Sequence, residues 1–126
     1  MNIVDFHHVA IICSNYAISK DFYMNILGFK VKNEVYRKER ESYKLDLIKG
    51  SMVIELFSFN NVPKRLSYPE GAGLRHLAFK TMDIENDHKC LSSKGIKVEN
   101  IRVDEFTGKK FFFFFDPDNL PLEIYE

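Results

Sequence analysis

The sequence contains two copies of one pattern, and this internal repeat constrains the fold more than any other feature. Three pairs of segments match in the same order, namely residues 6–11 with 74–79, residues 28–33 with 95–100, and residues 54–56 with 122–124. The offsets between matched positions are 68, 67 and 68 residues. Three anchors at nearly one offset predict a duplicated module, with a junction near Asn61–Gly73.

Each copy is predicted to fold as βαβββ. In the first copy, alternating and apolar runs predict strands at His8–Ile12, Lys30–Tyr36, Tyr43–Ile48 and Met52–Phe59, with a helix that Ser14 or Asn15 caps and Gly28 ends. In the second copy, a strand is predicted around His76, a helix from the cap Asp83 to Gly95, and strands at Lys97–Val103, Lys110–Phe115 and Leu122–Tyr125. The predicted class is α+β, with a mostly antiparallel sheet and flanking helices. At 126 residues we expect one domain made of two modules, about 1–62 and 73–126.

Composition excludes several functional classes. Lys plus Arg and Asp plus Glu both number 18, so no net charge recruits nucleic acid or an anionic membrane. The first residues lack a basic segment followed by a long apolar run, so we expect no signal peptide, and no apolar run approaches the roughly 20 residues that cross a bilayer. Cys13 and Cys90 do not form a disulfide framework, and we expect both to be reduced thiols in a cytoplasmic protein.

Four polar residues interrupt apolar strands and predict a metal site. Glu55 lies in the apolar run 52–57, Glu123 lies between two apolar neighbours, and His8 and His76 begin or lie within apolar strands. A carboxylate on a half-buried sheet face is costly unless it is paired or coordinated, and the strands of Glu55 and Glu123 carry no Lys or Arg to neutralise it.

The spacing supports one shared ion. Each His precedes its Glu by 47 residues, so two copies of the module would each present one imidazole and one carboxylate. Two nitrogens and two oxygens suit one divalent ion such as Ni²⁺, Co²⁺, Zn²⁺, Mn²⁺ or Fe²⁺, and leave positions open for substrate. Strand alternation predicts that His7 points away from His8, as a surface residue or a neighbour of the ligands. His88 has no partner at metal-binding spacing.

In order along the chain, these motifs resemble the glyoxalase/vicinal oxygen chelate superfamily. The residues that carry the resemblance are His8-Val9-Ala10-Ile11, Asp21-Phe22-Tyr23, Leu27-Gly28-Phe29, Val53-Ile54-Glu55-Leu56, His76-Leu77-Ala78-Phe79, Asp116-Pro117-Asp118 and Leu122-Glu123-Ile124. The resemblance covers nearly the whole chain. It implies paired βαβββ modules forming a cup around one metal ion held by the same four residues, and it implies a homodimer.

Within this family the chain is most similar to glyoxalase I. That resemblance implies a lyase acting on the adduct of methylglyoxal and a thiol such as glutathione, with proton transfer through a metal-bound enediolate. Glu123, or by symmetry Glu55, would be the general base. Two arginines that hold glutathione in glyoxalase I are replaced here by Ile12 and Tyr16, which puts the glutathione site in doubt.

Other members of the family remain open alternatives. A methylmalonyl-CoA epimerase-like enzyme usually has Gln where this chain has Glu55, thiol-transfer relatives normally combine two His with one Glu, and ring-cleaving dioxygenases are disfavoured. A metal-free binding protein for small molecules is the non-enzymatic alternative.

Two further segments could serve a site. The basic groups of Arg37-Lys38 with Arg40, and of Lys109-Lys110, could grip an anion, although such runs in turns are usually solvated. The run Phe111–Phe115 should place one set of rings against a helix and the other set in the cup.

Overall fold

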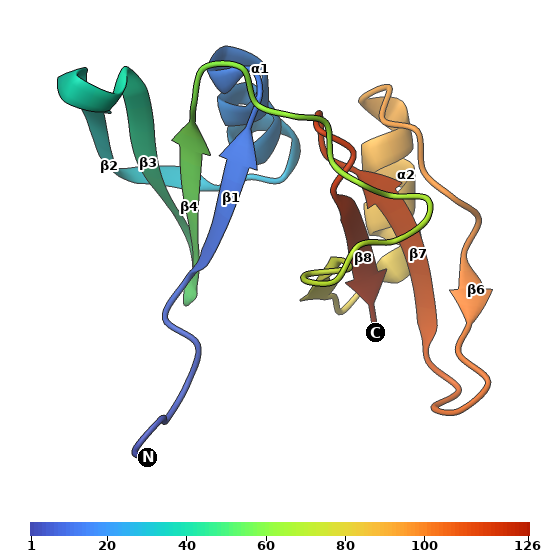
Figure 1. Ribbon diagram of the computed structural model, residues 1–126. Helices are drawn as coiled ribbons and strands as arrows, with labels where there is room; N and C mark the ends of the chain where they lie inside the picture. Colours follow the sequence, from blue (N-terminus) through green and yellow to red (C-terminus); the bar gives the residue numbers. More distant parts are fainter. The chain divides into compact units, whose positions relative to one another are not determined.

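The computed structural model describes residues 1–126, and its contacts divide the chain into two compact units, Met1–Pro63 and Lys64–Glu126. The division falls within the predicted junction. Both units contain a four-stranded sheet and one main helix (Figure 1).

The first unit has the predicted order of elements. Its strands are β1 (Val9–Cys13), β2 (Lys30–Arg37), β3 (Ser42–Lys49) and β4 (Met52–Ser58). The helix α1 (Tyr16–Asp21) continues as a π-helical turn η1 (Phe22–Ile26), and a short 3₁₀ turn η2 (Lys38–Arg40) joins β2 to β3. The sheet order is β1-β4-β3-β2, in which β1 runs parallel to β4 and the other pairs are antiparallel.

The second unit repeats this topology. Its elements are β5 (Leu77–Lys80), α2 (Ile84–Ser93), β6 (Arg102–Val103), β7 (Lys110–Phe115) and β8 (Pro121–Tyr125). The sheet order β5-β8-β7-β6, with β5 parallel to β8, is the counterpart of the first. The predicted α+β class with mostly antiparallel strands is therefore confirmed.

Local signals place the helices as predicted. The Asn15 side chain accepts a hydrogen bond from the amide of Ile18 at 3.2 Å, and the Asp83 side chain accepts one from Asn86 at 3.1 Å. Gly28 and Gly95 follow the two helices with φ of +78° and +77°, a conformation that glycine adopts without a Cβ penalty.

One predicted strand is largely wrong. Lys97–Val103 was expected to be a continuous strand, but only Arg102–Val103 pairs with β7, and Val98 makes an isolated bridge to Phe114. Residues 99–101, which lie between these two pairings, are not part of a strand. Apolar alternation alone did not reveal this interruption.

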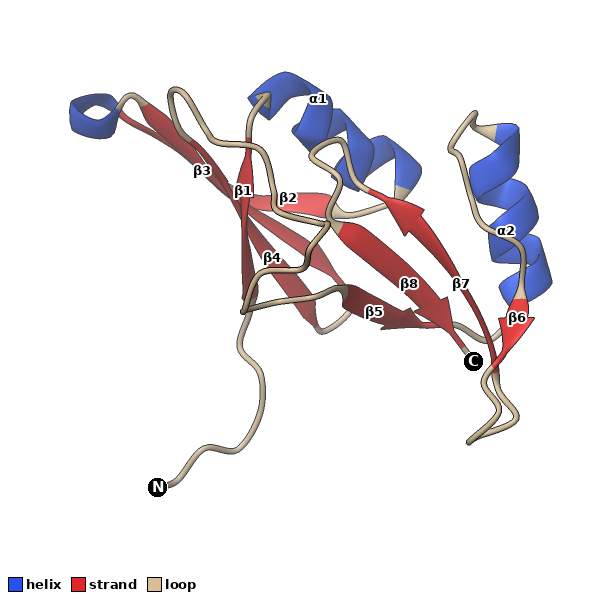
Figure 2. Cartoon of the chain, turned by 45° about the vertical axis from the view of Figure 1, so that its right-hand side comes forward, coloured by secondary structure: helices blue, strands red, loops and turns tan.

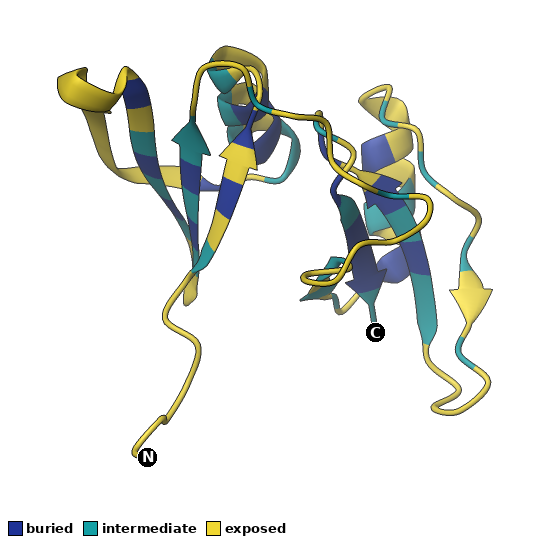
Figure 3. Cartoon of the chain, in the orientation of Figure 1, coloured by how far each residue is buried: buried dark blue, intermediate teal, exposed yellow.

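Each core lies between a helix and one face of its own sheet. Figure 3 shows buried and exposed residues alternating along β1, whose Ile11 and Cys13 are buried. Figure 2 shows α2 beside the sheet of its own unit, where the buried Phe112 and Phe114 of β7 face it. The opposite face of each sheet carries the polar residues that interrupt the apolar strands. Neither helix has the length and hydropathy required to span a bilayer.

Candidate metal centre

The structure brings His8 and Glu55 together in the first unit. His8 lies immediately before β1, and β1 runs parallel beside β4 with Ala10 opposite Glu55. His8 Nε2 lies 3.3 Å from Glu55 Oε2, and the side chain of Glu55 is 18% exposed. The pairing follows directly from the parallel register of the two strands.

His76 and Glu123 form the matching pair in the second unit. His76 lies immediately before β5, and Ala78 is opposite Glu123 in β8. His76 Nε2 lies 3.1 Å from Glu123 Oε2, whose side chain is 12% exposed. We call these two pairs the His8–Glu55 arm and the His76–Glu123 arm.

The four residues thus form two equivalent pairs of donors. In neither unit does a third His, Cys, Asp or Glu side chain join the pair to form a metal-binding group. Each arm therefore supplies one imidazole nitrogen and one carboxylate, which is the composition that borderline divalent metals accept. The sharing of one ion by both arms stays a prediction.

Each ligand-candidate imidazole has a neighbour at its other nitrogen. His7 Nδ1 lies 2.8 Å from His8 Nδ1, and Arg75 Nη1 lies 3.2 Å from His76 Nδ1. The expectation that His7 points away from His8 is wrong, because both residues precede β1, where strand alternation does not hold. Partners at the second nitrogen orient an imidazole and select its tautomer. Arg75 was not identified from the sequence, although it directly precedes His76.

A cation from the neighbouring strand distinguishes the first arm from the second. Lys44 on β3 donates to Glu55 Oε1 at 3.0 Å and to Asp46 Oδ1 at 2.5 Å. The hydrogen bond to Asp46, followed by the one to Glu55, raises the pKa of the Lys44 ammonium above its ordinary value. The β4 strand itself has no Lys or Arg, as noted from the sequence, but the partner that neutralises Glu55 comes from across the sheet.

The second arm has an aromatic neighbour instead. Phe113 of β7 is opposite Glu123, at the position that Asp46 occupies opposite Glu55. The ring of Phe113 meets that of His76 edge to face, with centroids 5.2 Å apart. Glu123 makes its ion pair with His76 alone. Two arms with the same donors therefore have different electrostatic surroundings.

The phenylalanine run divides as predicted. Phe112 and Phe114 are fully buried on the helix side, while Phe111, Phe113 and Phe115 lie on the face that carries Glu123. The ring of His88 on α2 stacks edge to face against Phe112 at 5.0 Å, and its Nε2 lies 2.9 Å from the Glu99 carbonyl oxygen. His88 thus has contacts of its own away from the arms.

One residue of each basic run, Arg37 and Lys110, makes contacts within its own unit. Arg37 donates to Ser42 Oγ at 2.7 Å, and its guanidinium lies 4.9 Å from the ring centroid of Phe57. Lys110 pairs with Glu85 of α2. Tyr16, at a position where glyoxalase I has arginine, donates a hydrogen bond to Glu34.

Comparison with known families agrees with this fold. The family described as the Glyoxalase/Bleomycin resistance protein/Dioxygenase superfamily matches residues 5–124. The chain belongs to this superfamily.

Close relatives extend over the whole chain. It is 60% identical to the uncharacterized protein YwkD of Bacillus subtilis (strain 168), with 95% of this chain and 94% of the relative covered. It is 56% identical to the uncharacterized protein YaeR of Escherichia coli (strain K12), with the same coverage. A crystal structure of a glyoxalase family protein from Enterococcus faecalis matches with a TM-score of 0.95, 52% identity and complete coverage of both chains.

A more distant structure has the same fold with a metal bound. The fosfomycin resistance protein FosX from Listeria monocytogenes, complexed with Mn(II) and sulfate, matches with a TM-score of 0.73 at 15% identity over 98% of this chain and 92% of that chain. At this identity the likeness concerns the fold alone.

Proposed function

We propose that the protein is an enzyme in which His8, Glu55, His76 and Glu123 hold one divalent metal ion. The observation that carries the proposal is the pair of His–Glu arms at 3.3 and 3.1 Å, formed at the same register in both units. Membership in a superfamily whose fold holds Mn(II) in FosX supports it. Two imidazoles and two carboxylates fit Ni²⁺, Co²⁺, Zn²⁺, Mn²⁺ or Fe²⁺ and leave room for substrate oxygens.

The reaction that this site supports best is proton transfer next to a carbonyl, as in a glyoxalase I-type lyase acting on the adduct of an α-oxo aldehyde and a thiol. A bound metal supplies a Lewis acid for the oxygen on which negative charge develops. Glu123 takes the proton and returns it to the adjacent carbon, because its carboxylate pairs with no Lys or Arg and its neighbour is the His76 imidazole. Glu55 already accepts a hydrogen bond from Lys44 at 3.0 Å, so we assign it to the metal rather than to proton transfer. We place this enzyme in the cytoplasm, as a homodimer.

A Glu123→Gln substitution tests the role of Glu123. The amide keeps the shape and loses the basicity, so we expect kcat to fall at least about a hundredfold for methylglyoxal with glutathione or cysteine. Metal content, measured by elemental analysis, should stay within about twofold of wild type. Glu105→Gln, at an exposed turn, is the matched control. Unchanged turnover in metal-loaded Glu123→Gln protein would remove Glu123 from this role.

One observation favours a second candidate, a metal-free binding protein. Lys44 already neutralises Glu55 without any metal, so the first arm does not need an ion to be stable. Protein purified without chelators decides between the two. If it holds no first-row metal and gains no thermal stability with Ni²⁺, Co²⁺ or Zn²⁺, the binding protein is favoured.

A further inference from the structure

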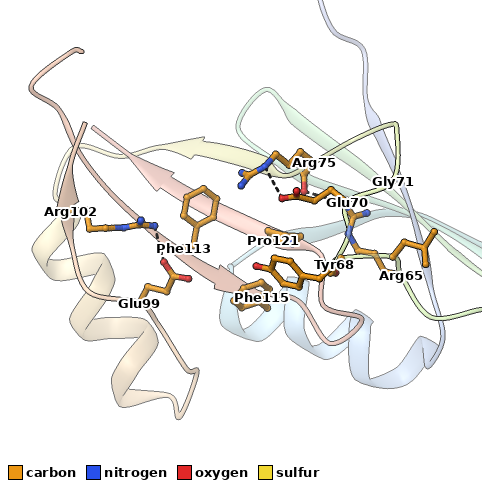
Figure 4. A pocket seen from close by; sticks show the side chains of 12 residues that line it. Arg65, Tyr68, Glu70, Gly71, Arg75, Glu99, Arg102, Phe113, Phe115 and Pro121 are labelled. Carbon is orange, nitrogen blue, oxygen red and sulfur yellow. Dashed lines mark hydrogen bonds and ion pairs between the residues drawn. The ribbon is translucent and has the colours of Figure 1, made fainter. Parts of the chain in front are cut away.

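A pocket of about 280 Å³ lies in the second unit beside the His76–Glu123 arm. Figure 4 shows that the segment 65–75 and strands β7 and β8 supply its wall. We call it the arginine pocket because three arginines line it, namely Arg65, Arg75 and Arg102. No residue from the first unit contributes to it.

The charges of the arginine pocket favour an anion. Its two acidic residues are each matched by an arginine: Arg75 Nε lies 3.4 Å from Glu70 Oε1, and Arg102 Nη2 lies 2.9 Å from Glu99 Oε2. Arg65 has no carboxylate partner and donates only to the backbone oxygens of Leu74 and Arg75. The lining therefore has one positive charge in excess.

The guanidinium groups have donors to spare. Each guanidinium carries five N–H groups in a planar fork, and the ion pairs of Arg75 and Arg102 use only part of this set. Such forks bind carboxylate and phosphate oxygens two at a time.

Part of the remaining wall is aromatic and apolar. Phe113, Phe115 and Pro121 lie between the arginines, and Figure 4 shows Arg102 with Glu99 on one side of Phe113 and Arg75 with Glu70 on the other. The guanidinium carbon of Arg102 lies 5.9 Å from the centroid of Phe113 and 4.9 Å from that of Phe111. These aromatic rings, together with the ion pair to Glu99, position the Arg102 guanidinium in the pocket wall.

The arginine pocket adjoins the reacting groups through two residues. Phe113 is opposite Glu123 and touches the ring of His76, and Arg75 Nη1 lies 3.2 Å from His76 Nδ1. A ligand that rests on Phe113 is therefore next to the His76–Glu123 arm.

We propose that the arginine pocket binds the anionic, non-reacting end of the substrate, a carboxylate or phosphate group carried on a flat apolar body. That the ligand is a substrate rests on the proposed function; the binding of an anion in this pocket does not. Arg65 and Arg102 recognise the anionic oxygens, and Phe113 and Phe115 accept the apolar body. The substrate is thus selected by a different set of residues from the metal ligands.

Calorimetric titration of the metal-free, full-length protein tests the assignment. The probes are phenylphosphonate, phenylacetate and benzyl alcohol, which share a ring and differ in charge. We expect the preferred anion to bind at least tenfold more tightly than the alcohol, and binding to weaken as salt rises. The ratio of the Kd values for phenylphosphonate and phenylacetate identifies which oxyanion the pocket prefers.

Variants locate the binding. Arg102→Gln and Arg65→Gln should each weaken the preferred anion at least about fivefold, Arg102→Lys should restore part of the loss, and the exposed Arg40→Gln of the first unit should bind as wild type. Thermal unfolding of each variant shows that it is folded. Equal binding of anion and alcohol, or Arg102→Gln and Arg65→Gln proteins that bind like wild type, would overturn the assignment.

The same titration on Glu123→Gln separates this inference from the proposed function. If Glu123→Gln keeps full activity and still binds the anion, the proposed role of Glu123 fails and the arginine pocket stands. If wild-type protein turns over its substrate but none of the three probes binds, the pocket assignment fails and the enzyme stands.

Discussion

At the scale of single residues, the two arms show how equal donors acquire different properties. Glu55 and Glu123 occupy the same register beside a parallel strand, but the residues across the sheet from them are Asp46 and Phe113. Lys44 donates hydrogen bonds both to Asp46 and to Glu55, the latter at 3.0 Å. The duplicated backbone fixes where each carboxylate lies, and residues of the neighbouring strand, Lys44 in the first unit, decide its charge balance.

Replacing Lys44 with Gln should strengthen metal binding. Without the ammonium, Glu55 and Asp46 present uncompensated negative charge to the ion, so we expect the apparent Kd for Ni²⁺ to fall about tenfold. Competition with a chromophoric chelator measures it. Lys32→Gln, on the exposed strand β2, provides the control for a general change in net charge. An apparent Kd that stays unchanged or rises in Lys44→Gln would show that Glu55 is not a ligand.

At the scale of elements, most of the fold followed from local signals and the repeat. Asn15 and Asp83 cap their helices, and Gly28 and Gly95 end them in the left-handed conformation, as the sequence predicts. Alternation correctly divided the phenylalanines of β7 between two faces. The His–Glu pairings were also predicted, because the repeat gave both the residues and their equal spacing.

The contacts that the sequence did not reveal depend on register between strands. Lys44 meets Glu55 only because β3 and β4 pair with Asp46 opposite Glu55, and a linear pattern contains no such information. Arg65 and Arg102 are 37 positions apart in the sequence, and the path of the segment 65–75 brings both to one pocket. The interruption of the strand predicted at Lys97–Val103 is likewise a tertiary effect, since the contacts with β7 near Val98 and Glu99 and those at Arg102 are separated by residues 100 and 101, which lie outside any strand.

A polar contact joins α1 to β2 in the first unit and gives a pH-dependent prediction. Tyr16 and Lys20 of α1 both donate to the carboxylate of Glu34, and the ring of Tyr16 stacks on Tyr43 at 4.2 Å. The hydrogen bond from Lys20, then that from Tyr16, lowers the pKa of Glu34 below its ordinary value of 4.5. The contact therefore stabilises the fold above pH 4.5, and its contribution is lost as pH falls through the lowered pKa.

Glu34→Gln should accordingly destabilise the protein at pH 7 more than at pH 3. We expect a loss of about 0.5–1 kcal/mol at pH 7, a modest value because the Glu34 side chain is 35% exposed, and a smaller loss at pH 3. Urea unfolding at the two pH values measures both. Glu39→Gln, in the exposed turn η2, should show no such pH dependence. A loss of stability that is the same at both pH values would exclude the carboxylate charge as its cause.

At the scale of the whole molecule, a single ion held by both arms would make the two units one thermodynamic domain. A ligand that binds only the folded state at a hundredfold excess over its Kd adds about 2.7 kcal/mol to stability. For a chain of this size we expect Ni²⁺ to raise the Tm by roughly 10 °C, in one transition, and a chelator to reverse the gain. Differential scanning calorimetry records both.

Two variants decide whether the ion is shared. If both arms hold one ion, His8→Ala and His76→Ala each remove nearly all of the Ni²⁺-dependent gain in Tm. If each arm bound its own ion, each variant would retain about half of the metal, by elemental analysis, and two transitions would appear. The second result would contradict the shared centre and leave the two units as independent domains.

The placement of Arg65 and Arg75 on the connecting segment that precedes β5 has an evolutionary consequence. Neither residue takes part in a strand ladder, so exchange of either leaves the hydrogen-bonded sheets in place. Arg75 contacts His76, whereas exchange of Arg65 leaves all four metal-ligand candidates with their neighbours. Successive duplicates of such a gene can therefore acquire new preferences through a short stretch of coil while the reactive apparatus is inherited intact. Divergence among relatives should accordingly concentrate in that stretch, where specificity can drift without loss of chemistry.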